Sequence, residues 1–138
     1  MTRGVKPSTI VPGTSPVTTV PKAPTYLSAD ARAEWRRVAP ILTDERKVLT
    51  IADLAALENY VIAVATMRQA HREIQIGGLV LGKGKRNPAS TVLLQAQQQQ
   101  LRAAGELGLT PAARSRAAMI GDNDDDDDNP LSIGRNRR

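Results

Sequence analysis

The sequence predicts an all-α protein with a helical hairpin core of about four helices, an N-terminal arm and a C-terminal tail. Apolar residues recur at helical spacing through the middle of the chain, and cap or turn residues separate the segments. Prolines gather at one end and aspartates at the other. We therefore expect a disordered basic arm over 1–25, a helical domain over 26–120 and a disordered acidic tail over 121–138.

The core of this domain is expected to be thin. Ile, Leu and Val make up 31 of 138 residues, about 22%, and Phe is absent. This fraction lies just above the level of roughly 20% below which disorder is the default expectation. Much of the other apolar content is Ala, which fills little volume. Either two helical hairpins close on each other, or neighbouring subunits complete the core.

Charge is distributed unevenly along the chain. The arm holds five of the nine prolines and carries +3, the helical domain carries 13 basic and 8 acidic residues, and the tail carries −3. A basic body suits a polyanionic partner such as nucleic acid. A charge excess that serves only solubility is the alternative.

The first helix is predicted over about 28–38. Ser28 is a good N-cap residue, and Pro40 is expected to end the helix. Trp35 shares a face with other apolar residues and should anchor the helix in the core. The other side carries a group of arginines, which form either a phosphate-facing surface or a solvated face: Arg32, Arg36 and Arg37.

A second, longer helix is predicted over 51–76. Thr50 and Asp53 fit a capping box, and Gly77-Gly78 should end the helix. At 1.5 Å per residue it would span roughly 39 Å. Its apolar stripe supplies core or interface candidates, namely Leu54, Leu57, Val61 and Val64.

The segment 79–86 is predicted to be a loop or short hairpin with a basic tip formed by Lys83, Lys85 and Arg86. Asn87-Pro88 then opens a third helix over 88–107, whose apolar side includes Leu94 and Leu101. The glutamines in its middle are good helix formers, so this run need not be disordered.

Thr110-Pro111 opens a fourth helix that carries Arg114 and Arg116 and should end near Gly121. The aspartates that follow cannot pack and are expected to be solvated. The last residues hold a candidate motif for docking to another protein, made of Leu131, Ile133, Arg135, Arg137 and Arg138.

Residues for catalysis or cofactor binding are lacking. Without Cys there is no disulfide, thiol nucleophile or Cys-based zinc site, and a single His, His71, excludes a histidine-rich metal site. The segment around Gly82-Lys83 fails the phosphate-loop pattern in spacing and in its missing Ser or Thr. We therefore expect no enzyme activity, no metal and no cofactor. With few aromatic residues for stacking, duplex DNA fits better than single strands.

The ordered residues resemble a known family in the order and spacing of several short motifs: Tyr26-Leu27-Ser28, Glu34-Trp35-Arg36, Leu49-Thr50 with Asp53, Leu57 and Tyr60, the turn at Gly77, Asn87-Pro88, and Glu106 to Arg114. In these features the chain is similar to the small subunit of tailed-phage terminases over about residues 22–118. Ala113 departs from the family pattern, which has Ser at this position.

This resemblance implies a factor for packaging viral DNA. Small terminases assemble as rings of helical subunits, for which we expect about eight to ten copies. They recognise the packaging start site and recruit and regulate the large subunit, which carries the ATPase and nuclease. We expect the protein in the host cytoplasm, outside the virion and without a membrane partner. The six basic residues of the first helix and the 79–86 segment would face DNA, and the tail would dock to the large subunit.

Two other interpretations compete. A dimeric helix-turn-helix transcription regulator shares the basic helical body, but it needs two helices of modest length joined by a short turn. The predicted helix over 51–76 is long for that motif, and the connection over 77–87 is also long. A pure interaction or scaffold protein would leave the basic face solvated and would not bind DNA at moderate salt.

Overall fold

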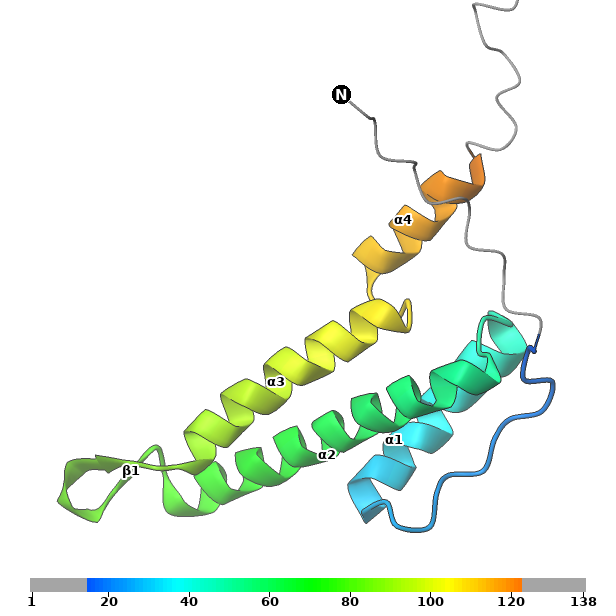
Figure 1. Ribbon diagram of the computed structural model, residues 1–138. Coiled ribbons are helices and arrows are strands. Elements are labelled where there is room, and N and C mark those ends of the chain that lie inside the picture. The colour runs from blue at the N-terminus through cyan, green and yellow to red at the C-terminus, as the bar shows by residue number, and fades with distance from the viewer. Residues whose placement is uncertain (1–14, 123–138) are drawn as a thin grey trace, which may run out of the picture.

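The predicted all-α fold class is confirmed by the computed structural model of the protein, which describes residues 15–122. Three helices form the body and a fourth leaves it (Figure 1). The predicted docking motif at residues 131–138 lies outside the described part of the chain. The elements are α1 (Ala29–Pro40), a π-helical turn (Ile41–Glu45), a 3-10 turn (Ile51–Asp53), α2 (Leu54–Gly77), β1 (Val80–Leu81), β2 (Lys85–Arg86), α3 (Ala89–Glu106) and α4 (Pro111–Asp122).

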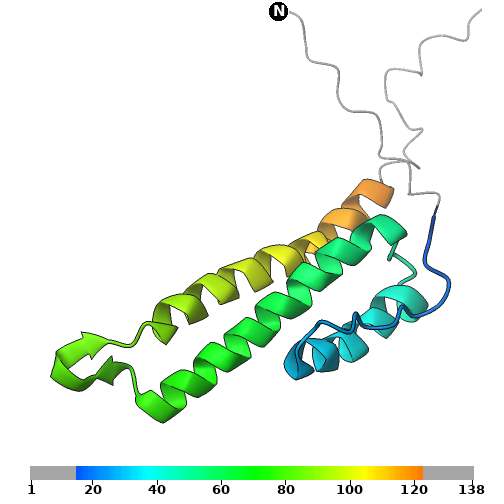
Figure 2. The ribbon, with the colours of Figure 1, turned by 60° about the horizontal axis from the view of Figure 1, so that its bottom comes forward.

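Helices α2 and α3 run antiparallel as a long hairpin (Figures 1 and 2). Small residues recur every seven positions on both helices, at Ala56, Ala63, Ala70 and Gly77 on α2 and at Ala89, Ala96 and Ala103 on α3. A seven-residue repeat keeps one stripe of each helix turned toward its partner. These small side chains let α2 and α3 run side by side, and four of them, namely Ala56, Ala63, Ala96 and Ala103, line an open groove between the two helices.

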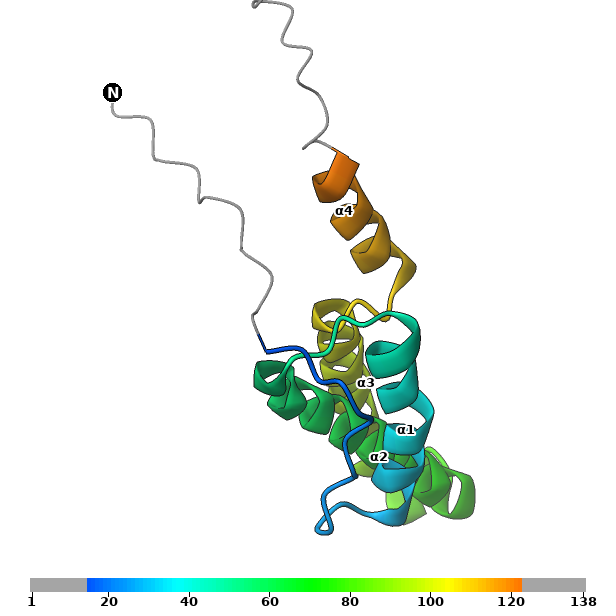
Figure 3. The same cartoon turned by 90° about the vertical axis from the view of Figure 1, so that its right-hand side faces the viewer.

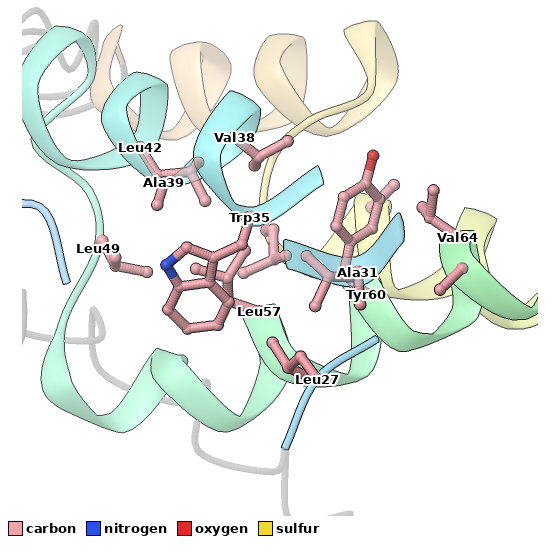
Figure 4. Packing of buried hydrophobic residues seen from close by; sticks show 14 residues of the cluster. Leu27, Ala31, Trp35, Val38, Ala39, Leu42, Leu49, Leu57, Tyr60 and Val64 are labelled. Carbon is pink, nitrogen blue, oxygen red and sulfur yellow. The ribbon is translucent and has the colours of Figure 1, made fainter. Parts of the chain in front are cut away.

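The core lies where α1 packs against α2 (Figure 4). Trp35 and Val38 from α1 meet Leu57 and Val61 from α2, and each of the four is 2% exposed or less. The indole Nε1 of Trp35 donates a hydrogen bond of 2.8 Å to the carbonyl oxygen of Pro21. Of the other predicted core or interface residues on α2, Val64 is buried and Leu54 is half-buried against the same cluster.

Residues near the end of the predicted arm over 1–25 make backbone hydrogen bonds to the chain before α2. The backbone N–H of Val17 donates to the carbonyl of Leu49 at 2.9 Å, and Pro16 forms an isolated bridge with Thr50. Residues 15–17 of the Pro-rich segment therefore lie beside the chain that precedes α2 and are held there by an isolated bridge. Proline restricts the backbone without preventing this, because the intervening residues still supply hydrogen-bond donors and acceptors.

Helix α1 ends at Pro40, as predicted, although the proline lies inside its last turn and the chain stays helical beyond it. Pro40 has helical angles, and the chain continues into the π-helical turn, where the N–H of Arg46 bonds to the carbonyl of Ile41 at 3.0 Å. The proline removes one helical hydrogen bond. The turn beyond it, however, brings Leu42 into the core with no exposed surface. Burial of this side chain compensates for the missing bond.

Side-chain caps begin the helices where the sequence predicts them. Ser28 accepts a bond from the first turn of α1, and Thr110 does the same for α4, each at 3.3 Å. Thr50 and Asp53 form a capping box ahead of α2, although the first turn there is a 3-10 turn. Asn87 accepts from the N–H of Ala89 at 3.0 Å before α3. These local signals therefore predict the starts of the helices well.

Helix α4 extends away from the body after a turn at Gly108, whose φ is +67° (Figure 3). The guanidinium of Arg46 donates to the Gly108 carbonyl at 2.7 Å and holds this corner against the turn that follows α1. Within residues 15–122, no helix combines the length and apolar character needed to cross a bilayer.

Candidate nucleic-acid interface

The basic segment after α2 forms a two-stranded hairpin at the far end of the α2–α3 pair (Figure 1). Val80 pairs with Arg86 and Leu81 with Lys85. The turn passes through Lys83 and Gly84, whose φ angles are 68° and 72°. Lys83, Lys85 and Arg86 are all exposed. The prediction of a loop or short hairpin with a basic tip is confirmed.

No acidic residue lies near this hairpin in the sequence. From residue 74 to residue 105 there is no Asp or Glu, whereas four basic residues occur: Lys83, Lys85, Arg86 and Arg102. The ion pairs in the described residues all involve Asp30 or Glu34, which belong to α1. The hairpin therefore carries positive charge without a local counter-charge, which favours a polyanion.

Arg86 is positioned by the start of α3. Its Nε donates to the Ser90 hydroxyl at 2.8 Å, and that hydroxyl donates to the Asn87 carbonyl at 2.7 Å. Asn87 also donates to the Gly78 carbonyl at 2.8 Å, which ties both ends of the hairpin together. Because Arg86 uses Nε here, the two terminal nitrogens of its guanidinium are left to bind a phosphate.

Arg37 has a different environment from the one predicted. Its guanidinium pairs with both carboxylate oxygens of Glu34 and lies within 3.4 Å of the Tyr60 hydroxyl. Glu34 is only 2% exposed and also binds Arg68 at 3.0 Å. The charge of Arg37 therefore compensates a buried carboxylate, although its side chain is 60% exposed, and its DNA-facing role stays a prediction.

Glu34 is the centre of a buried polar network. Burial alone would raise the pKa of Glu34, but hydrogen bonds from Arg37 and Tyr60, together with the charges of Arg37 and Arg68, hold that pKa below its usual value. Burial and the bond to Glu34 raise the pKa of Tyr60. Helical spacing in the sequence could have predicted the burial of Glu34, since it lies three residues after Ala31 and four before Val38 on the buried face.

The two remaining arginines of α1 lie apart from the hairpin. Arg36 is exposed and Arg32 partly exposed, and neither forms an ion pair within residues 15–122. Asp30, in the first turn of α1, pairs with Arg72 of α2, with 2.6 Å between the carboxylate oxygen and the guanidinium nitrogen. Helix α2 continues from Arg72 to Gly77 before the hairpin begins. The six predicted DNA-facing residues thus form two separate groups.

Comparison with known proteins settles the family. The model of the family described as phage terminase, small subunit, matches residues 31–124. The chain belongs to this family. No curated protein and no solved structure matches it. The match runs from α1 through α4 and confirms the resemblance seen in the sequence, which favours a terminase subunit over a helix-turn-helix regulator.

In this terminase small subunit, the large apolar residues of α3 are not in the core of the single chain. Leu94 is 51% exposed and Leu101 63% exposed, whereas Ala96 and Ala104 are buried. The close approach of α2 selects small side chains at the inner positions of α3. Leu94 and Leu101 are therefore left as candidates for an interface between subunits, and that role stays a prediction.

The terminase small subunit also has an open groove of about 660 Å³ between α2 and α3, which includes Ala63 and Ala96 in its lining. Within the described residues, no three His, Asp or Glu side chains lie close enough together to hold a metal ion. The most distinctive chemical feature of the described surface is therefore the basic hairpin.

Proposed function

We propose that this terminase small subunit binds duplex DNA at the packaging start site, assembles as a ring, and recruits and stimulates the large ATPase-nuclease subunit from the host cytoplasm. It acts as a binding and regulatory subunit without catalytic activity of its own. The observation that carries the DNA-binding part is the acid-free stretch from residue 74 to residue 105, whose exposed end holds Lys83, Lys85 and Arg86.

If this hairpin contacts phosphates, the affinity for DNA should depend on salt concentration by a predictable amount. Each phosphate that a basic side chain neutralises lowers the slope of log affinity against log salt by about 0.9. Three contacts per subunit would therefore give a slope near −3 for each subunit that touches DNA. Arg32 and Arg36 of α1 supply a second, separate contact where DNA extends along the body.

Charge reversal at the hairpin tip tests this proposal. We expect Lys83→Glu to lower duplex affinity by about tenfold or more at 50 mM salt and to flatten the salt slope, because one attraction becomes a repulsion. Lys47→Glu is the matched control, since Lys47 is also an exposed lysine with positive φ, at 53°. Fluorescence anisotropy with a labelled duplex measures both. Equal losses in the two variants would contradict a specific role of the hairpin.

The tail is assigned to the large subunit. Removal of residues 121–138 deletes Leu131, Ile133, Arg135, Arg137 and Arg138, and we expect it to lower stimulation of the large subunit's ATPase. Assembly should be unchanged, because α1, α2 and α3 all end before residue 121. Steady-state ATP hydrolysis by the large subunit is the measurement, with native mass as its control. Undiminished stimulation would refute the assignment.

A further inference from the structure

A polar stripe runs along α3, and two of its residues, Gln95 and Arg102, also line the open groove between α2 and α3. Thr91, Gln95, Gln98 and Arg102 are spaced by four, three and four residues, and all four are exposed. At 3.6 residues per turn this spacing places them on one side of the helix. Ala96 and Ala104, which are buried against the body, lie on the opposite side.

The side chains of this stripe match those that bind base edges in the major groove. Arg binds guanine and Gln binds adenine through paired hydrogen bonds, and the Thr methyl contacts the methyl of thymine. From Thr91 to Arg102 the helix rises about 16 Å, which corresponds to roughly five base pairs. No carboxylate lies within the stretch 74–105, and Glu106, one turn after Arg102, lines the same groove at the far end of the stripe.

The hairpin stands at the N-terminal end of this stripe. Strand β2 ends at Arg86, and α3 begins at Ala89. The bond from Arg86 to Ser90 holds a phosphate-binding group beside the first turn of α3. Phosphate contacts of this kind set the position of a protein on DNA, and base contacts then specify the sequence.

A second copy of the chain is the competing occupant of α3. The exposed leucines, Leu94 and Leu101, lie on a different side of the helix from the polar stripe. The centre of a subunit interface favours apolar over polar side chains. An interface through the leucines therefore leaves the stripe of Thr91, Gln95, Gln98 and Arg102 open.

We propose that this stripe reads base edges in the major groove of duplex DNA while the basic hairpin holds the adjacent phosphates. The inference rests on the proposed DNA binding and deepens it, because it names the residues that discriminate between sequences. Gln95 and Gln98 are the central residues of the stripe. Where either forms two hydrogen bonds with an adenine, the affinity for that base pair should exceed the affinity for another base pair by about tenfold.

Selection from a pool of duplexes with a randomised central region tests the inference. The wild-type protein is expected to enrich a consensus of about five base pairs. Gln95→Ala with Gln98→Ala should lower the preference for the selected duplex over a scrambled one by tenfold or more, with little change in affinity for the scrambled duplex. The matched control is Gln75→Ala with Gln97→Ala, two exposed glutamines off the stripe.

The possible failures are distinguishable. Wild-type protein that binds the pool without enriching a sequence overturns base readout but leaves DNA binding intact. Equal losses for selected and scrambled duplexes in the stripe variant, with circular dichroism and native mass unchanged, also overturn it. Absence of binding to any duplex at 50 mM salt overturns the proposed function together with the inference.

Discussion

Glu34 keeps its charge inside the protein because every side of its carboxylate is engaged. Tyr60 donates to it at 3.0 Å, Arg68 at 3.0 Å, and Arg37 pairs with both oxygens. One turn away, Asp30 pairs with Arg72. Asp30 and Glu34 are four residues apart on α1, and their partners Arg72 and Arg68 are four residues apart on α2 in the opposite order. Together the two ion pairs set the antiparallel register of α1 on α2.

Glu34→Gln tests this network. We expect it to lower the free energy of unfolding by about 1–3 kcal/mol, less than for a fully buried ion pair, because Arg37 and Arg68 are partly exposed and regain water. Chemical denaturation measures the change. Glu58→Gln is the control, since among residues 15–122 the Glu58 side chain bonds only to the exposed Tyr26, and this variant's free energy of unfolding should stay within about 0.5 kcal/mol of wild type.

The pH dependence follows from the lowered pKa of Glu34. Because the folded-state pKa lies below the unfolded value of about 4.3, the carboxylate stabilises the fold fully above that value and less as pH falls through the folded pKa. The stability gap between wild type and Glu34→Gln should therefore shrink below about pH 4. A gap that stays constant down to pH 3 would contradict the role given to Glu34.

At the scale of elements, features that depend on neighbouring residues in the sequence were predictable, and features that depend on tertiary packing were not. Ser28, Thr50, Asn87 and Thr110 mark the helix starts because caps depend on neighbouring residues alone. The π-helical turn beyond Pro40 brings Leu42 into the core, which is a tertiary effect. No local pattern could have predicted it.

The candidate site shows the same division. The basic hairpin was predictable, because glycines and basic residues between two helical segments indicate an exposed turn. The separation of Arg32 and Arg36 from Lys83 follows from the packing of α1 on α2, which spacing along the chain does not specify. Exposure of Leu94 and Leu101 also escaped the sequence pattern, because close packing of α2 on α3 selects alanines instead.

At the scale of the whole molecule, the fold class and the family were predictable and the assembly is still a proposal. The single chain leaves Leu94 and Leu101 in solvent on α3. Together with the thin core, this favours burial against another subunit. A closed ring would provide the same contact to every copy.

We expect Leu94→Glu with Leu101→Glu to break this assembly, because the change buries two charges in the proposed interface. Native mass spectrometry should give about eight to ten copies of the 14.8 kDa chain for the wild type and smaller species for the variant. Val48→Glu changes another exposed apolar residue and should leave the mass unaltered. A wild-type monomer, with or without DNA, would contradict the ring.

Lysine footprinting on the wild-type protein tests the central claim, DNA binding at the acid-free end of the α2–α3 hairpin. The protein is acetylated with and without a duplex, and the modified lysines are quantified by mass spectrometry. We predict that the duplex protects Lys83 and Lys85, while Lys22 and Lys47, which are also exposed, react as before. Protection of Lys22 or Lys47 with Lys83 and Lys85 still reactive would contradict the account.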